Sequence, residues 1–152
     1  MRRILVSEFF FLDEFLDKES YSNLLKLIQI AEFIRKDTGK PVLINNYNSG
    51  GSLGLRGFRP MNCNVGAPMS QHKFMNAIDI NIGGMSNKEM FEYVKSKANN
   101  LYDLGLRRVE DISITPNWLH LDCKEHNEMA ILIVDKVKVT GKILIIKNNL
   151  KP

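Results

Sequence analysis

The chain has 152 residues, of which 44% are hydrophobic and 25% charged, and its formal net charge is +4. This length suits one ordinary domain, and no stretch has a composition that predicts disorder or repeats. The basic residues are scattered without an aromatic motif, so they indicate no nucleic-acid partner. The longest apolar run, around Met129 to Val134, is too short to span a membrane. We predict one domain over residues 1–152, a monomer without nucleic-acid or membrane partners.

The N-terminus begins with a basic pair and then becomes apolar, but Glu8, Asp13 and Glu14 interrupt it before a signal peptide could form. The sequence therefore predicts no secretion signal and a protein that stays cytoplasmic until it is released. Cys63 and Cys123 lie far apart without a CxxC pattern, which predicts two free, partly buried thiols.

Helical periodicity begins at Tyr21 and is ended by Gly39 and Pro41. The apolar stripe of this helix consists of Leu24, Leu25, Ile28, Ala31 and Ile34. A short strand is expected from Pro41 to Asn45, followed by a loop from Asn46 to Ala67. A loop of this length inside a domain is usually functional.

A second strand is expected from Ala77 to Ile82, and a capping box of Ser86 and Glu89 opens a second helix that Gly105 closes. The stripe of that helix is Phe91, Val94, Ala98 and Leu101. The remaining strands are expected at Leu106–Ile112, Trp118–Cys123, Met129–Val137 and Lys142–Lys147, with turns at Thr115-Pro116-Asn117 and Thr140-Gly141. Two main helices on a largely antiparallel sheet make an α+β domain.

Alternation in the strand Trp118–Cys123 places Leu119 and Leu121 in the core and His120 on the opposite face. A second histidine, His72, comes shortly before Asp79, and a carboxylate inside an apolar strand needs a partner. Two histidines and a carboxylate are the protein ligands of a hydrolytic zinc site. The alternatives from the residues alone are a loop histidine without a ligand role and an Asp79 paired with a lysine.

The string Ser70-x-His72-x6-Asp79, followed by Trp118-x-His120, resembles the D-alanyl-D-alanine carboxypeptidase-like zinc peptidases, which share their fold with the hedgehog signalling domain. The similarity extends to Lys40–Asn46, to Arg56-Gly57-Phe58-Arg59-Pro60 and to Gly66-Ala67, and it covers about Asp37 to Cys123. Among the members of this family, the compact ones found in bacteriophages and prophages resemble this chain most.

The resemblance implies one zinc ion per chain, held by His72, Asp79 and His120. It also implies that Arg59 contacts a substrate carbonyl or carboxylate, because a planar, permanently charged guanidinium suits both groups. The alternative is a surface arginine. Three weaker candidates for substrate contact are Arg56, Ser70 and Trp118. Arg56 stands at a position where the family often has serine. Ser70 either orients a ligand or caps a loop.

Two positions depart from the family pattern. Met75 stands where the family usually has glycine, and Asn117 stands where many members have the acid that moves protons during hydrolysis. As general base we rank Glu110 first and Asp122 second, with Asp111 third. Glu110 has the alternative of a salt bridge with a neighbouring arginine, and Asp122 that of a structural role. His126 is expected in an exposed turn.

The function implied by the resemblance is hydrolysis of peptide bonds in peptidoglycan stem peptides, as a D-Ala-D-Ala carboxypeptidase or an L-Ala-D-Glu endopeptidase. A phage endolysin would be an example of such a protein. The alternative is a catalytically inactive, zinc-containing module that binds a peptide or a cell-wall fragment, which Asn117 favours. A phage structural protein is the third possibility.

Overall fold

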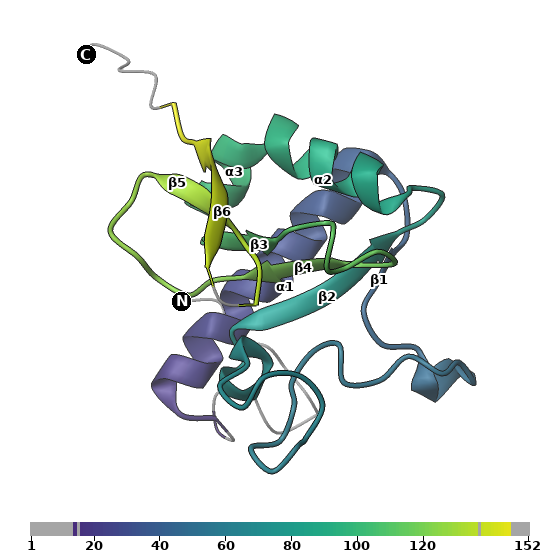
Figure 1. Ribbon diagram of the computed structural model, residues 1–152. Helices are drawn as coiled ribbons and strands as arrows, with labels where there is room; N and C mark the ends of the chain where they lie inside the picture. The colour runs from purple at the N-terminus through teal and green to yellow at the C-terminus, as the bar shows by residue number, and fades with distance from the viewer. Residues whose placement is uncertain (1–13, 15, 137, 147–152) are drawn as a thin grey trace.

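The computed structural model describes residues 14, 16–136 and 138–146 (Figure 1). Features predicted at residues 1–13, 137 and 147 lie outside this part of the chain. The first helix, α1 (Lys18–Thr38), begins after Asp17, whose carboxylate accepts two backbone N–H groups of the first turn. It ends at Gly39, which is left-handed with a φ of 66°. The predicted helix and its C-terminal glycine are confirmed.

The second predicted helix consists of two helices, α2 (Asn87–Ser96) and α3 (Ala98–Asp103). The predicted capping box of Ser86 and Glu89 opens α2. The break falls at Lys97, whose N–H is shared between two preceding carbonyls and whose ammonium lies 2.9 Å from Asp37 of α1. The prediction of one continuous helix is wrong, because neither glycine nor proline marks this break in the sequence.

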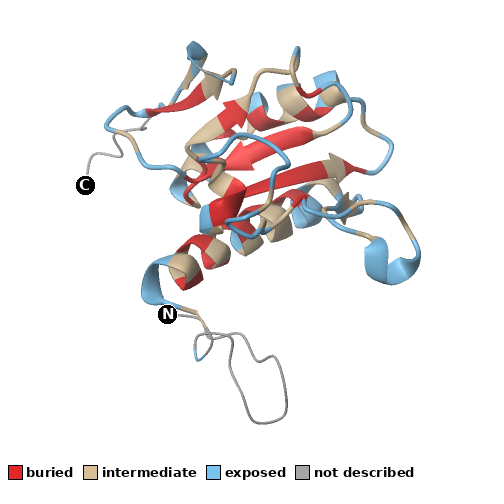
Figure 2. Ribbon diagram, turned by 60° about the horizontal axis from the view of Figure 1, so that its bottom comes forward, coloured by how far each residue is buried: buried red, intermediate tan, exposed pale blue. Residues whose placement is uncertain are grey.

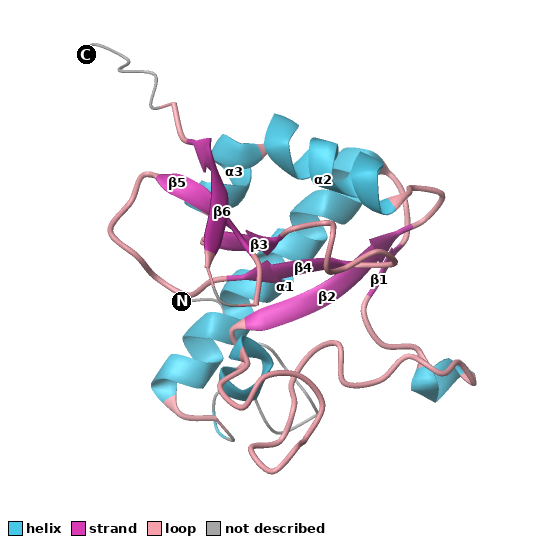
Figure 3. Cartoon of the chain, in the orientation of Figure 1, coloured by secondary structure: helices cyan, strands magenta, loops and turns pink. Residues whose placement is uncertain are grey.

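In the described part of the chain, six strands form one mixed sheet in the order β1-β2-β4-β3-β5-β6 (Figure 3). Their bounds are β1 Val42–Leu43, β2 Ala77–Ile82, β3 Arg108–Glu110, β4 Leu119–Asp122, β5 Ala130–Val134 and β6 Val139–Leu144. Strands β3 and β5 are parallel, and every other neighbouring pair is antiparallel. The α+β class and the largely antiparallel sheet are confirmed, with three helices in place of two.

The turn between β5 and β6 differs from its predicted position. Thr140 and Gly141 lie inside β6, and the chain turns between Asp135 and Lys138, where the Lys138 N–H donates to the Asp135 carboxylate at 2.8 Å. Gly141 pairs with Ile133 of β5, and a Cβ at Gly141 would come within 3.2 Å of that isoleucine side chain. This glycine therefore makes room for a neighbouring side chain, which the sequence pattern does not distinguish from a turn.

The two faces of the sheet differ in character. One face packs against the helices, and α1 passes behind β2 and β4 in Figure 1. The strand residues buried in this hydrophobic core include Ile78, Ile80, Val109, Leu119, Leu121 and Cys123. The intervening residues Asp79, His120 and Asp122 occupy the opposite face, and they too are buried. The central part of the sheet is accordingly coloured as buried in Figure 2. The predicted inward and outward alternation of β4 is confirmed.

Strands β1 and β2 are joined by a long loop that contains only two short 3-10 helices, η2 (Tyr47–Ser49) and η3 (Gln71–Phe74). The predicted strand at its start is reduced to the two residues of β1. Cys63, in this loop, and the buried Cys123 are both free thiols, as predicted. No helix in the described part of the chain is long and apolar enough to cross a membrane.

Candidate metal centre

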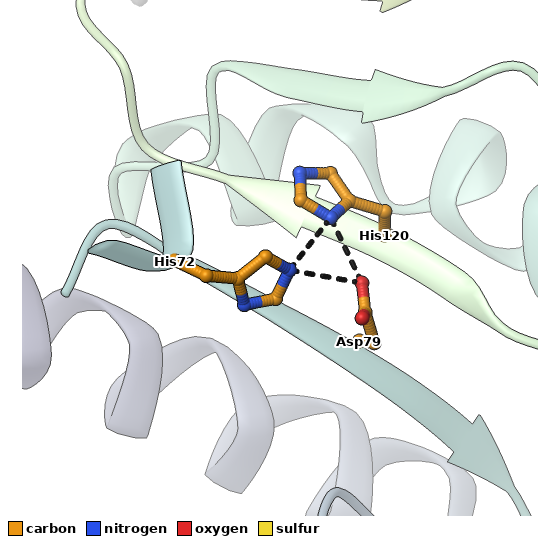
Figure 4. Close-up of side chains that lie close together, drawn as sticks. All are labelled: His72, Asp79 and His120. Carbon is orange, nitrogen blue, oxygen red and sulfur yellow. Dashed lines mark hydrogen bonds and ion pairs between the residues drawn. The ribbon is translucent and has the colours of Figure 1, made fainter. Parts of the chain in front are cut away.

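Three side chains from separate elements converge on the sheet face opposite the helices (Figure 4). His72 Nε2 lies 3.2 Å from Asp79 Oδ1 and 3.2 Å from His120 Nδ1, and His120 Nδ1 lies 2.8 Å from Asp79 Oδ1. All three residues are buried, and they form the only such group of His, Cys, Asp and Glu among the described residues. The structure therefore brings the three predicted ligands together in a cluster that can hold a metal ion.

Local structure explains how these residues meet. Asp79 of β2 and His120 of β4 are direct partners in the antiparallel register, and directly opposed residues lie on the same face of a sheet. His72 lies in η3, which ends at Met75, a residue in the left-handed conformation with a φ of 51°. This turn redirects the chain from η3 into β2, so that His72 faces back toward Asp79.

The atoms of each ligand that face away from the cluster are also engaged. His72 Nδ1 lies 2.7 Å from the Gly57 carbonyl. Because a carbonyl only accepts hydrogen bonds, Nδ1 is the donor, and Nε2 carries the electron pair that can bind a metal. His120 Nε2 lies 3.4 Å from the Asp122 carboxylate. Asp79 Oδ2 receives an N–H of Arg59 at 3.0 Å, which leaves Oδ1 facing the histidines. Such partners orient metal ligands in known metal sites.

The spacing of the three atoms fits a tetrahedral ion. Bond lengths near 2.0–2.1 Å place the ligands of a tetrahedral zinc roughly 3.3 Å apart. The distances of 3.2, 3.2 and 2.8 Å fall close to this value. Two imidazoles and one carboxylate leave the fourth coordination position open, as in catalytic zinc sites.

The protonation of the metal-free cluster follows from the pKa shifts of His120 and Asp79. Burial disfavours a charged His120, but hydrogen bonds to Asp122 and Asp79 outweigh burial and raise its pKa to about 10. Burial likewise opposes ionisation of Asp79, yet interactions with His120 and His72 keep its pKa well below the ordinary value. At neutral pH a protonated His120 therefore lies between two carboxylates, where a metal ion would replace the proton's charge.

Arg59 is almost buried, with 11% of its side chain exposed, so it is not a surface arginine. Its guanidinium pairs with Asp79 and with the Leu55 carbonyl. Gly66 makes room for it, because a Cβ at that glycine would come within 2.8 Å of Arg59 Nη1. Arg59 thus contacts Asp79, one of the three candidate metal ligands.

Arg56 lies beside the cluster and is 8% exposed. Its backbone carbonyl accepts the Asp79 N–H at 2.8 Å, and its backbone N–H donates to the Asn45 side chain at 3.1 Å. The buried Nη2 of its guanidinium has no hydrogen-bond partner. Burial lowers the pKa of Arg56, and the negative charge of Asp79 partly opposes that effect.

The first two candidates for the general base have different surroundings. Both oxygens of Asp122 lie within 3.0 Å of Arg108 Nε, and Oδ1 also accepts the Lys124 N–H. Asp122 is only 1% exposed. Its contacts agree with the structural alternative, in which it orients His120.

Glu110 is half-buried at the end of β3. Continuing the register of β3 and β4 by one residue places Glu110 beside His120 on the same face, and the charge of Glu110 contributes to the raised pKa of His120. The alternative salt bridge of Glu110 is absent among the described residues, because Arg107 pairs with Glu125 and Arg108 with Asp122.

Four other residues considered in the sequence differ in their exposure and contacts. The hydroxyl of Ser70 makes no cap hydrogen bond to η3, and Trp118 is half-buried one residue before β4. Asn117 is exposed, and its carbonyl accepts the Asn81 side chain at 2.7 Å. His126 corrects a prediction, because it is half-buried rather than an exposed turn residue. Its Nε2 lies 3.1 Å from the Arg107 carbonyl, and it is not one of the three residues of the cluster.

Asp111, the third candidate base, is committed elsewhere. Its carboxylate accepts the Ser113 N–H at 3.0 Å and the Thr140 hydroxyl at 3.1 Å. Sequence reasoning missed the Gly57 carbonyl and the pairing of Arg108 with Asp122. The second of these follows from strand alternation only when the register of β3 and β4 is known.

Comparisons of the chain with known protein families, with curated proteins and with solved structures found no match.

Proposed function

We propose that the protein is a zinc hydrolase that cuts peptide bonds in peptidoglycan stem peptides. The observation that carries this proposal is the convergence of His72 Nε2, Asp79 Oδ1 and His120 Nδ1, each ligand being oriented by a second partner. Zinc suits this ligand set because borderline-soft imidazoles combine with one carboxylate and a fourth position stays open.

The class of substrate rests on the sequence resemblance. The residues that the resemblance to D-alanyl-D-alanine carboxypeptidase-like peptidases assigns as ligands are the ones that meet in space. The proposed fold is accordingly that of the hedgehog and DD-peptidase group. The substrate is a D-Ala-containing or L-Ala-D-Glu bond of the stem peptide.

Each residue of the site has a separate role in the proposed hydrolysis. A zinc ion held by His72, Asp79 and His120 would supply Lewis acidity, which lowers the pKa of water and polarises a carbonyl. Glu110 takes a proton at a carboxylate oxygen from the water whose oxygen bonds to the carbonyl carbon, and it delivers this proton to the amine nitrogen as the carbon–nitrogen bond breaks. Arg59 holds Asp79 Oδ2, and Asp122 holds the ring of His120.

A second function is favoured by one observation. Asn117 is exposed three residues before His120 and carries an amide, which cannot transfer protons, where many members of the resembling family have an acid. A module that binds zinc and a wall peptide without cutting it is compatible with this residue. Both functions use the metal site, but only hydrolysis requires Glu110.

The test combines metal content, stability and cleavage. We expect purified protein to carry about one zinc ion, and chelation to lower its melting temperature because metal binds the folded state. Mass analysis of purified peptidoglycan fragments incubated with the zinc-loaded protein should show cleaved stem peptides. His72→Ala, Asp79→Ala and His120→Ala should each lose zinc and cleavage.

His126→Ala is the matched control, since it removes an imidazole outside the cluster and should keep both zinc and cleavage. Metal-free protein with undiminished stability would contradict the zinc site. Protein that is zinc-loaded but leaves every fragment intact would contradict the hydrolase and favour the binding module.

A further inference from the structure

The segment that carries Arg56 is tied directly to the metal centre. The Arg56 carbonyl accepts the Asp79 N–H at 2.8 Å, and the next carbonyl, that of Gly57, lies 2.7 Å from His72 Nδ1. Two of the three ligands therefore contact two consecutive peptide groups of this loop. The position of Arg56 beside the cluster is fixed by the same bonds that orient the ligands.

Among the described residues, Arg56 forms no ion pair with a carboxylate, although the charge of Asp79 acts on it from nearby. Three other described arginines that are buried or half-buried pair with carboxylates: Arg59 with Asp79, Arg107 with Glu125 and Arg108 with Asp122. Arg56 is more than nine-tenths buried, and its Nη2 has no hydrogen-bond partner. A buried charge without a partner costs free energy, which a bound anion would offset.

Asp79 cannot serve as that partner, because its carboxylate is already engaged. Oδ2 accepts from Arg59, and Oδ1 faces the two histidines. A divalent ion at the cluster would add further positive charge next to Arg56. Arg56 and such an ion would together place positive charge on this side of the cluster, which favours a negatively charged ligand.

We propose that Arg56 is a substrate-binding residue that receives a carboxylate of the peptide beside the metal centre, while Arg59 is a positioning residue that holds Asp79. The guanidinium fork matches a carboxylate geometrically, which a lysine does not. The identity of the ligand as a wall peptide rests on the proposed function, whereas the affinity of Arg56 for a carboxylate does not.

Two sources of this carboxylate are chemically equivalent. One is the C-terminal carboxylate of a peptide ending in D-Ala-D-Ala, and the other is the free α-carboxylate of a γ-linked D-Glu. Each is tested with a pair of peptides, one with the free acid and one with the corresponding amide. The pair whose affinities differ more identifies the group that Arg56 binds.

The experiment measures dissociation constants by calorimetry for the zinc-loaded protein, without reference to cleavage. Wild type should bind the free acid more tightly than the amide. In Arg56→Gln this acid-over-amide preference should fall by about 10- to 100-fold, the effect of losing a hydrogen bond to a charged group. Arg56→Lys should restore only part of it. Arg35→Gln, which removes an exposed arginine of α1, should leave the preference unchanged.

Zinc content and melting temperature of each variant separate binding from folding. Arg56→Gln and Arg56→Met should keep zinc and melt no lower than wild type, because each removes an unpaired buried charge. A marked loss of stability in both variants would overturn the proposal in favour of a structural role. An unchanged acid-over-amide preference in folded Arg56→Gln, or its absence in wild type, would overturn it as well.

These outcomes are independent of hydrolysis. If the wild type cleaves nothing but its preference for acids depends on Arg56, the hydrolase is contradicted and the carboxylate site stands. If the wild type cleaves stem peptides and Arg56→Gln keeps the full preference, the hydrolase stands and the carboxylate site is contradicted.

Discussion

At the scale of single residues, the two first candidates for the general base differ in their partners. Glu110 is half-buried beside His120 without an ion-pair partner in the described part of the chain. Asp122 is buried and held by Arg108 Nε at 2.8 and 3.0 Å. A carboxylate that keeps its arginine partner stays ionised throughout a reaction cycle, so it can orient a ring but is a poor proton carrier.

Exchanging each acid for its amide tests this division. Glu110→Gln should keep zinc and fold while kcat falls by about 10² or more, because only the proton carrier is lost. Asp122→Asn should act through the metal, with zinc affinity reduced by about 10- to 100-fold. Zinc content by metal analysis and kcat at saturating zinc distinguish the two effects. Normal turnover in Glu110→Gln together with a zinc-loaded, inactive Asp122→Asn would exchange their roles.

At the scale of elements, the left-handed residue at the end of η3 determines how His72 meets β2. Met75 has a φ of 51°, and this conformation strains a residue with a Cβ by about 1–2 kcal/mol. Glycine adopts it freely, which gives a physical reason why glycine would be suitable at this position. Met75, which stands where the resembling family usually has glycine, therefore occupies a position whose positive φ favours glycine.

Substitutions at Met75 should reveal that requirement. Met75→Gly should raise the free energy of unfolding by up to about 1 kcal/mol, since relief of strain exceeds the entropy that glycine costs. Met75→Val should lower it by about 1 kcal/mol or more, because β-branching aggravates the left-handed conformation. Urea unfolding midpoints at constant m-value measure both changes. The reverse order of the two variants would show that side-chain packing, and not φ, governs this position.

The elements themselves show what a sequence pattern can predict. The helix ended by Gly39, the capping box at Ser86 and the strand Ala77–Ile82 appear where periodicity and caps indicate them. These are local signals, so they do not depend on which strands become neighbours. The parallel pairing of β3 with β5 and the position of Gly141 in β6 depend on contacts between distant segments, which alternation does not encode.

The same distinction applies to the site. An acid in an apolar strand and a histidine facing away from the core draw attention to Asp79 and His120, and the family resemblance selects these two residues and His72 as the candidate ligands. The burial of Arg56, the bond between Arg59 and Asp79, and the contact of His72 with Gly57 are tertiary facts of a long, aperiodic loop. No local pattern predicts which carbonyl or carboxylate such a loop presents to a ligand.

At the scale of the whole molecule, stability and metal binding are linked through the proton on His120. Its pKa is raised from 6.5 to about 10, so the metal-free folded state holds a proton that the unfolded state releases above about pH 6.5. This contribution to stability is complete below pH 6.5 and is lost as pH rises through about 10. Zinc requires the deprotonated ring, so its apparent affinity rises over the same range.

The difference in melting temperature between zinc-loaded and chelated protein should therefore widen between pH 7 and pH 9.5. Thermal unfolding of both forms at matched ionic strength measures it, and other titrating groups affect both forms alike. His120→Ala should show no such widening, since neither the proton nor the metal can bind there. A gap that narrows with rising pH would contradict the protonated His120.

The register of the sheet gives the metal centre one further property. Asp79 and His120 are direct partners across β2 and β4, and successive residues of a strand point to opposite faces. A slip of one residue between these strands would carry a ligand into the hydrophobic core and bring an isoleucine or leucine to the cluster. A chain with that error could not coordinate zinc. With the proposed zinc site, the fraction of purified protein that takes up one equivalent of zinc would therefore count the molecules whose central strands have paired correctly, and refolding could be followed by zinc uptake.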